Sequence, residues 1–293
     1  MWLFAPSWNQ TCSRQVLLAL KSSVVDVMRT ELIEKMVGRK LDQEFPTRSP
    51  QIGEPRLVVS NLRRGNVVKG VSFQVRRGEI LALTGLVGSG RTETARLLFG
   101  ADRRDGGTVS LDGKALTISS PRDAIRSGIA LLTEDRKGQG LILAHSVRDN
   151  FALPNLPSWS RLGALRRALV RAAYRVAAER FRIAAAGPGV KVGTLSGGNQ
   201  QKVVLAKWLE RNCEVILFDE PTRGIDVGAK YELYQMMQAL AGRGKAVLMV
   251  SSELPEVLGL ADRVLVMHGG RIVGEVTDVA HTTQEQVLQL AMG

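Results

Sequence analysis

One glycine-rich segment, Gly85–Thr92 (GLVGSGRT), has the residue types that bind a chain of phosphates. Its glycines leave main-chain amides uncovered, so that these amides can point inward at an anion. The apolar run Glu79–Thr84 predicts a strand before it, and Thr92–Phe99 predicts a helix whose positive end points at the same place. We therefore expect a triphosphate here, with the Thr92 hydroxyl offered to Mg²⁺. The expected nucleotide contacts are Gly85, Gly88, Ser89, Gly90, Arg91, Thr92 and Glu93.

The segment departs from the usual phosphate-loop pattern at Arg91, where that pattern has lysine. A lysine ammonium is compact and touches the β- and γ-phosphates, whereas a guanidinium keeps the charge but is planar and larger. The change predicts that phosphate binding survives while the catalytic geometry suffers.

Two adjacent acids, Asp219 and Glu220, end the apolar run that begins at Val215. A short continuous apolar run is typical of a parallel strand buried on both faces. We expect Asp219 to hold Mg²⁺ through water. Glu220 is expected to act on the attacking water, as a general base or as a positioning group.

A second anion site is predicted at Leu195–Lys202 (LSGGNQQK), where Ser196 and two glycines precede the helical run Gln201–Leu209. A second site beside the first serves no purpose in one chain. It makes sense facing the γ-phosphate of a nucleotide held by another copy or another domain, which suggests a head-to-tail dimer. The candidates are Ser196, Gly197, Gly198 and Gln200, together with Asp226 in the segment after Glu220.

The composition is that of an ordinary globular protein with a large positive charge. Of 293 residues, 44% are hydrophobic and 23% charged, with a net charge of +12. Nucleic acid, anionic lipid or an acidic partner would each suit that charge, but no stacking aromatics interleave with the basic residues, and a solvated surface explains it as well. No apolar run nears the ~20 residues of a membrane span, and no signal peptide is visible, which favours a cytosolic protein.

Two cysteines, Cys12 and Cys213, give no disulfide framework, and no Cys/His cluster has metal-site spacing. Cys213 is expected to pack as a small buried hydrophobe.

The chain is predicted to have three parts. Residues 1–29 carry no readable motif. Residues 30–55 hold a helix at Glu31–Val37, capped by Thr30, and a proline-containing linker from Arg39 to Pro55. A compact domain then covers residues 56–293, with a helical subdomain at about 141–195.

Within that domain, residues 152–186 are expected to be helical. Leu165, Leu169, Ala173 and Val176 recur on one face, and arginines line another. His268-Gly269-Gly270 predicts a hairpin turn. The other expected strands are Leu57–Val59, Val71–Val75, Val109–Leu111, Ile129–Leu132, Val215–Phe218, Ala246–Val250, Val264–Met267 and Arg271–Val276.

Together, the glycine loop, Leu195–Lys202 and Val215–Asp226 resemble the ATP-binding cassette (ABC) ATPases. The finer markers Thr133–Lys137 (TEDRK) and Arg223–Gly228 (RGIDVG) are similar to those of the simple-sugar importers, in which one polypeptide carries two fused cassettes. This chain looks like the second, C-terminal cassette, including the arginine in its phosphate loop. The likeness implies an α/β P-loop NTPase fold with a mostly parallel core sheet, a small antiparallel β subdomain and a helical subdomain.

The resemblance covers roughly Thr30 to Gly293 and leaves residues 1–29 unmatched. Within it, Thr30–Pro46 looks like the tail of a first cassette and its linker, and the rest of that cassette is expected to be missing.

Several positions depart from the family pattern. Glu134 aligns with the family's glutamine and would still approach Mg²⁺ as a carboxylate. Ser252 aligns with the switch histidine and is expected at the catalytic site, although it cannot relay charge as imidazole does. No aromatic residue for adenine stacking stands near Leu62–Val68. With Arg91, these departures imply a site that binds ATP and Mg²⁺ but turns ATP over poorly, beside an intact Leu195–Lys202 segment.

The resemblance also implies partners. These are the transmembrane permease subunits of a sugar importer, a first cassette on a separate chain or a second copy, and indirectly a periplasmic or extracellular sugar-binding protein. The place would be peripheral, at the cytoplasmic face of the inner or plasma membrane, with no nucleic acid expected. Two alternatives stay open: a soluble cassette protein acting on nucleic acid or ribosomes, and a truncated product without activity of its own.

Overall fold

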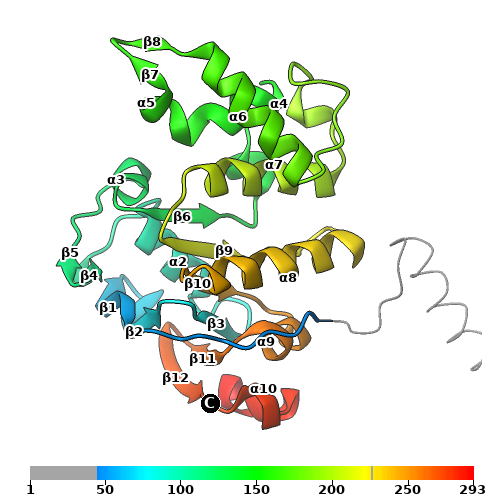
Figure 1. Ribbon diagram of the computed structural model, residues 1–293. Coiled ribbons are helices and arrows are strands. Elements are labelled where there is room, and N and C mark those ends of the chain that lie inside the picture. Colours follow the sequence, from blue (N-terminus) through cyan, green and yellow to red (C-terminus); the bar gives the residue numbers. More distant parts are fainter. Residues whose placement is uncertain (1–44, 226) are drawn as a thin grey trace, which may run out of the picture. The chain divides into compact units, whose positions relative to one another are not determined.

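The structure is a computed structural model that describes residues 45–225 and 227–293 of the chain. Cys12, the helix expected at Glu31–Val37 and the site candidate Asp226 lie outside the described residues. Element labels are those of Figure 1.

A six-stranded sheet forms the centre of the domain (Figure 1). Five of its strands run parallel to one another, and the edge strand β12 is antiparallel to its neighbour β11. Every residue of β6, β9 and β10 is buried. This is the result expected for continuous Val, Ile and Leu runs. In spatial order the strands are β12 (Arg271–Val276), β11 (Arg263–His268), β3 (Ile80–Gly85), β10 (Ala246–Val250), β9 (Val215–Asp219) and β6 (Ile129–Leu132).

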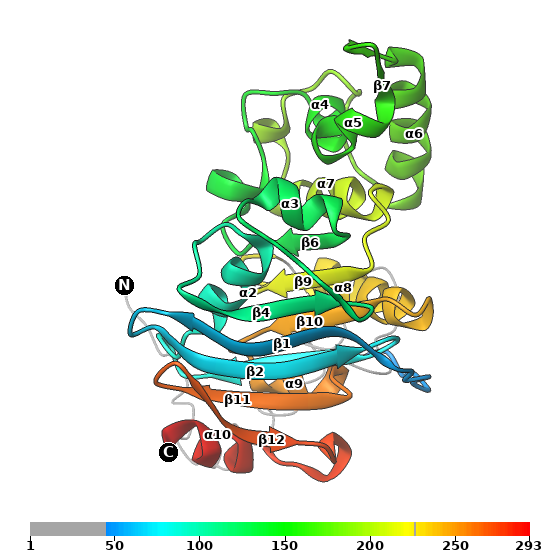
Figure 2. The ribbon, with the colours of Figure 1, turned by 90° about the vertical axis from the view of Figure 1, so that its left-hand side faces the viewer.

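A four-stranded antiparallel sheet lies beside the central one (Figure 2). Its alternating burial, for example in β2, places one face on the core. Helix α2 (Arg91–Phe99) packs against strands of both sheets and so lies between them. In spatial order the strands are β2 (Val68–Arg76), β1 (Pro55–Arg64), β4 (Gly106–Leu111) and β5 (Lys114–Ala115).

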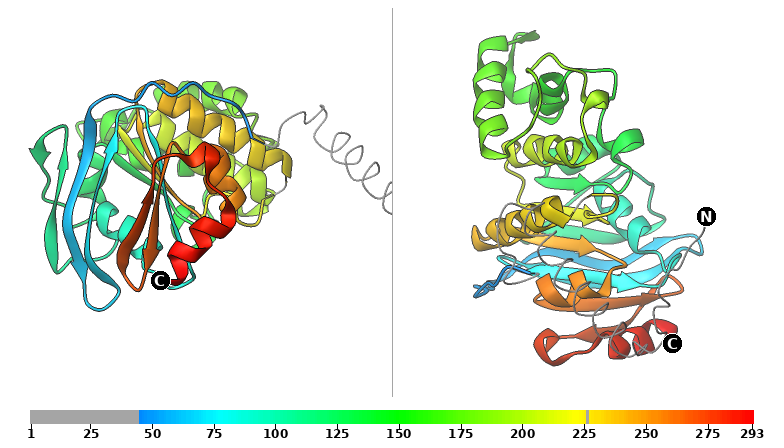
Figure 3. Two further views of the ribbon diagram at one scale, coloured as in Figure 1. Left: turned by 90° about the horizontal axis from the view of Figure 1, so that it is seen from below. Right: turned by 90° about the vertical axis from the view of Figure 1, so that its right-hand side faces the viewer.

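Three helices cover the face of the central sheet that is turned away from the antiparallel sheet (Figure 3). They are α8 (Val227–Gly242), α9 (Leu254–Leu260) and α10 (Gln284–Met292), the last preceded by the short helix η4 (Val279–His281). The stretch expected as a linker begins to be described at Phe45, whose ring packs 5.4 Å from that of Tyr234 on α8.

The remaining helices form a separate group at the top of Figure 1. α3 (Pro121–Arg126) packs against α2 and β6, below that group. The group consists of η1 (Arg136–Gly140), α4 (Val147–Ala152), η2 (Leu153–Asn155), α5 (Leu156–Trp159), α6 (Arg167–Arg180), η3 (Val192–Thr194) and α7 (Gly197–Glu210), with the hairpin β7 (Ser160–Arg161) and β8 (Ala164–Leu165).

The prediction of helix throughout residues 152–186 is wrong in its middle. Leu162 and Gly163 both adopt positive φ, 50° and 78°, and turn the chain into the β7–β8 hairpin. The residues that α6 buries differ from those expected to recur on one face: they are Val170, Tyr174 and Ala177, spaced four and three residues apart. Leu165, Leu169 and Val176 are exposed instead.

Cys213 is confirmed as a small buried side chain just before β9. Burial raises the pKa of its thiol to about 11, so it stays protonated at neutral pH.

Candidate functional site

The phosphate loop joins β3 to α2, as the sequence predicted. Gly85 adopts a φ of 150°, and a Cβ there would lie 2.1 Å from the oxygen of Met267 on β11, so only glycine fits. Gly88, at φ 79°, has nothing within 4 Å of a built Cβ and faces open space. Its neighbours at positions 86 and 87 are exposed.

The end of this loop has unsatisfied donors. The N-cap residue of α2, Gly90, has no side chain that could cap the helix. The amides of the first turn therefore lack a partner from the helix. The Ser89 hydroxyl is buried without a hydrogen-bond partner. A buried hydroxyl and uncapped helix amides together fit an anion.

Thr92 and Asp219 meet at the helix end. The Thr92 hydroxyl donates a 2.8 Å hydrogen bond to Asp219 Oδ1, and Asp219 is almost fully buried. Burial raises the pKa of Asp219 to about 6, with the charge of Glu220 adding to the rise and the Thr92 hydrogen bond opposing it. A hydroxyl and one carboxylate are what Mg²⁺ takes from a protein when phosphates and water complete its octahedron. Among the described residues, no three His, Cys, Asp or Glu side chains form a metal cluster.

The Arg91 side chain reaches the residues that follow β9 and β10. Its Nη1 donates a 2.9 Å hydrogen bond to the main-chain oxygen of Ser251, and its Nη2 lies 3.7 Å from Glu220 Oε1. Burial lowers the pKa of the guanidinium, although the carboxylates of Glu220, Asp219 and Glu93 oppose that effect. Glu93 itself lies in the first turn of α2 and is partly buried.

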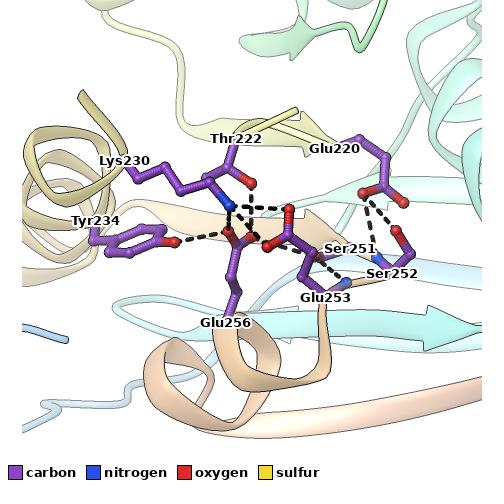
Figure 4. Close-up of polar contacts among 8 residues, drawn as sticks. All are labelled: Glu220, Thr222, Lys230, Tyr234, Ser251, Ser252, Glu253 and Glu256. Carbon is purple, nitrogen blue, oxygen red and sulfur yellow. Dashed lines mark hydrogen bonds and ion pairs between the residues drawn. The ribbon is translucent and has the colours of Figure 1, made fainter. Parts of the chain in front are cut away.

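Glu220 is held by Ser252 (Figure 4). Strands β9 and β10 are parallel with Asp219 opposite Val250, so the residues after both strands are neighbours. The Ser252 amide and hydroxyl donate to Glu220 Oε2 at 3.2 and 3.1 Å. Both oxygens of the expected general base therefore face a protein group, because Oε1 faces Arg91.

The second predicted anion site has the expected local form. Ser196 caps α7, its hydroxyl accepting from the Asn199 amide at 3.4 Å and from the Asn199 side chain at 2.9 Å. Ser196 is exposed, and Gly197 and Gly198 are half-buried. Gln200 is buried, and its amide donates to the oxygens of Val192 and Leu195, so it supports the turn before α7.

Glu134, the other expected Mg²⁺ candidate, has a partner after β9. Its carboxylate forms an ion pair with Arg223, in the loop after β9. Two residues on, the Arg136 guanidinium donates to the main-chain oxygens of Arg223 and Gly224 at 3.2 and 3.1 Å. A Cβ at Gly197 would lie 2.8 Å from Arg136 Nη2, so the Arg136 guanidinium also lies against the start of α7.

The sequence was compared with known families and proteins. The family model described as "ABC transporter" matches residues 68–223, which is more than half of the chain. The chain belongs to the ABC transporter family. Residues 68–223 include the phosphate loop, the Ser196 cap and the acids at the end of β9.

Individual relatives agree with that family. The chain is 45% identical over 291 residues to "Ribose import ATP-binding protein RbsA" of Oceanobacillus iheyensis, covering 99% of this chain and 58% of the relative. It is 49% identical over 274 residues to "Putative ribose/galactose/methyl galactoside import ATP-binding protein 1" of Rhizobium meliloti, covering 93% and 54%. The chain thus spans about half the length of these relatives. The first alignment extends into residues 1–29, beyond the resemblance visible from motifs.

Solved structures share the fold. A nucleotide-free ATP-binding cassette from an ABC transporter superimposes with a TM-score of 0.66 at 23% identity, covering 82% of this chain and 96% of that one. The expected α/β P-loop fold of the ABC type, with antiparallel and helical parts, is confirmed. Within residues 45–225 and 227–293, no helix of this ABC cassette combines the length and apolar character needed to cross a bilayer.

Two residues at the site of the ABC cassette, Arg136 and Glu256, could not be placed there from the sequence. Arg136 appeared only as a family marker, because nothing in its local spacing places it against Gly224. Glu256, on α9, carried no signal except one acid in an apolar run. It is 2% exposed, and its carboxylate lies among Thr222, Lys230 and Tyr234 (Figure 4).

Proposed function

We propose that this chain is the ATP-binding cassette of a monosaccharide importer, corresponding to the second cassette of the relatives, and that it binds ATP with Mg²⁺. The names of the relatives support the sugar part. The observation that carries the nucleotide part is the buried, unpartnered Ser89 hydroxyl at the uncapped end of α2. A phosphate oxygen would satisfy both.

Thr92 and Asp219 would hold the Mg²⁺ ion. Bound there, the metal would neutralise phosphate charge and orient the terminal phosphate. Asp219 must be ionised to bind a cation, and its pKa of about 6 leaves it mostly ionised at neutral pH. Glu134, paired with Arg223, is the less direct candidate for this ion.

We further infer that hydrolysis at this chain's own loop is slow. A general base must reach a water with a free oxygen, but the two oxygens of Glu220 face Ser252 and Arg91. The Arg91 guanidinium hydrogen-bonds to the Ser251 oxygen and lies beside Glu220, so it is already engaged by protein groups. Ser252, where the family has a histidine, offers a hydroxyl that carries no charge.

The Ser196 end of α7 is proposed to act on a different nucleotide. Ser196 is exposed and α7 begins with two glycines, so a phosphate can approach the amides of its first turn. The chain would therefore complete the site of a first cassette, or of a second copy, and share ATP across the interface. Asp226 and Gln200 stay predictions as nucleotide contacts.

Partners and place follow from the same assignment. Permease subunits would receive the motion of the paired cassettes, and a sugar-binding protein outside the membrane would select the sugar. The chain would lie at the cytoplasmic face of the membrane. No described feature favours nucleic acid as a partner.

Titration of the chain with ATP, with and without Mg²⁺, tests the proposal. Saturable binding that Mg²⁺ strengthens, and that D219N makes insensitive to Mg²⁺, is expected. Equal affinity with and without Mg²⁺ in the wild type would remove the metal assignment. Absence of binding at millimolar ATP would overturn the proposal as a whole.

A further inference from the structure

Glu256, on α9, is a buried carboxylate that contacts the residue after β10. Its Oε2 accepts a 2.8 Å hydrogen bond from the Thr222 hydroxyl, in the loop after β9. Its Oε1 accepts from the Tyr234 hydroxyl at 2.7 Å and from Lys230 Nζ at 3.0 Å, both on α8 (Figure 4). One side chain on α9 thus bonds two further segments of the cassette.

Ser251 connects this carboxylate to the nucleotide site. Its hydroxyl lies 3.4 Å from Glu256 Oε2 and accepts from the Glu253 amide at 3.1 Å. Its main-chain oxygen accepts from Arg91 and also from the Thr84 hydroxyl at 2.9 Å. Ser251 is fully buried, and the next residue, Ser252, donates twice to Glu220.

One cation, Lys230, pairs with both carboxylates of this group. Burial lowers the pKa of Lys230, but the hydrogen bonds that its ammonium donates to Glu253 and Glu256 outweigh that effect and leave the pKa raised, so the ammonium is charged. The Glu253 carboxylate, 46% exposed, shares this ammonium from the solvent side. Removing Glu256 would leave Thr222, Tyr234 and Lys230 without a common acceptor.

We propose that Glu256 is a positioning residue for Glu220. It fixes the Ser251–Ser252 turn, and the turn sets where the Glu220 carboxylate and the Arg91 guanidinium lie. Because Glu256 also binds Thr222 and α8, a shift of α8 changes the same turn. The catalytic consequence rests on the proposed function, whereas the positioning of the turn does not.

A matched pair of variants tests this inference on the full chain. E256Q keeps the shape of the side chain but removes its charge and one acceptor, whereas E253Q removes only the exposed partner of Lys230. Hydrogen exchange of the peptide that contains Ser252 reports the turn without needing ATP, and urea unfolding reports global stability. Steady-state hydrolysis and ATP affinity are measured on the same samples.

In E256Q, exchange at the Ser252 peptide is expected to rise by about tenfold over the β3 and β9 peptides, with little change in E253Q. The hydrolysis rate should change by more than about threefold, while ATP affinity changes less. T222V, which removes one donor from the same carboxylate, should give a smaller change and replaces E256Q if that variant does not fold.

Two results would overturn the inference: unchanged exchange at Ser252 in folded E256Q, or a rise shared equally by all peptides, which is the mark of a purely structural residue. An absence of ATP binding by the wild type would instead remove the proposed function and leave the exchange result valid.

Discussion

The Arg91 guanidinium donates a hydrogen bond to the main-chain oxygen of Ser251, so the phosphate loop is tied to the turn that follows β10. The other guanidinium nitrogen approaches Glu220. The residue that replaces the usual lysine therefore binds protein groups on the far side of the site. This arrangement accounts for a cassette that has the loop for a triphosphate but restrains the carboxylate needed for hydrolysis.

Replacing Arg91 by lysine should accelerate hydrolysis. A lysine side chain is compact and suits the phosphates, and it cannot hold Ser251 and Glu220 with a planar fork. We expect R91K to raise the hydrolysis rate by about tenfold at saturating ATP. R91M is the control, since it releases Glu220 without supplying a cation, and it should weaken ATP binding. A rate for R91K at or below that of the wild type would contradict the restraint.

Two glycines of the loop should respond differently to alanine. In G85A, the new Cβ would meet the Met267 oxygen at 2.1 Å, so we expect a loss of stability of about 3 kcal/mol or more. In G88A, the built Cβ has no protein neighbour within 4 Å, and only the positive φ costs stability, about 1 kcal/mol. Urea unfolding measures both.

Binding separates the two positions further. G88A places a methyl group where the proposed phosphates lie, so its ATP affinity should fall by about tenfold although it folds. An affinity equal to that of the wild type would show that the open side of Gly88 is not the phosphate side.

Lys207, on α7, should make stability depend on alkaline pH. Its ammonium is buried and donates to the Gly140 oxygen, and burial lowers its pKa to about 8 from 10.5. Between these two values the unfolded chain binds more protons than the folded chain, so the free energy of unfolding rises with pH. The rise should be on the order of 2 kcal/mol from pH ~8 to ~10.

K207M provides the comparison, because methionine has a similar length and does not titrate. Urea unfolding of both proteins at several pH values gives the difference directly. The gain on raising the pH should be present in the wild type and missing from K207M. Parallel curves for the two proteins would mean that Lys207 titrates normally in the folded state.

The features of the fold and site that depend on local patterns could be predicted from the sequence. The strand–loop–helix around Gly85–Thr92, the buried strand before Asp219 and the Ser196 cap were all predicted, since each is encoded by neighbouring residues. The β7–β8 hairpin was missed because Leu162, which adopts a positive φ, carries no turn signal of its own. The residues that α6 buries follow the expected apolar face by one position, because the packing partners of the helix decide which residues are covered.

The long-range part of the site could not be predicted. Glu220 and Ser252 lie 32 positions apart and become neighbours only through the parallel register of β9 and β10. The pairing of Glu134 with Arg223 spans 89 positions and is not encoded by any local pattern. Alignment with a family gives such residues a role but does not give them these partners.

ATP hydrolysis by a mixed pair of cassettes tests directly whether the Ser196 end of α7 completes a partner's nucleotide site. This chain is mixed with a first cassette, produced from the part of a ribose import relative that this chain does not cover, and ATP hydrolysis is compared with that of each component alone. We expect that the wild-type chain stimulates hydrolysis and that S196R does not, although S196R still binds ATP. Equal stimulation by S196R would contradict the claim that the Ser196 end of α7 completes a partner's nucleotide site.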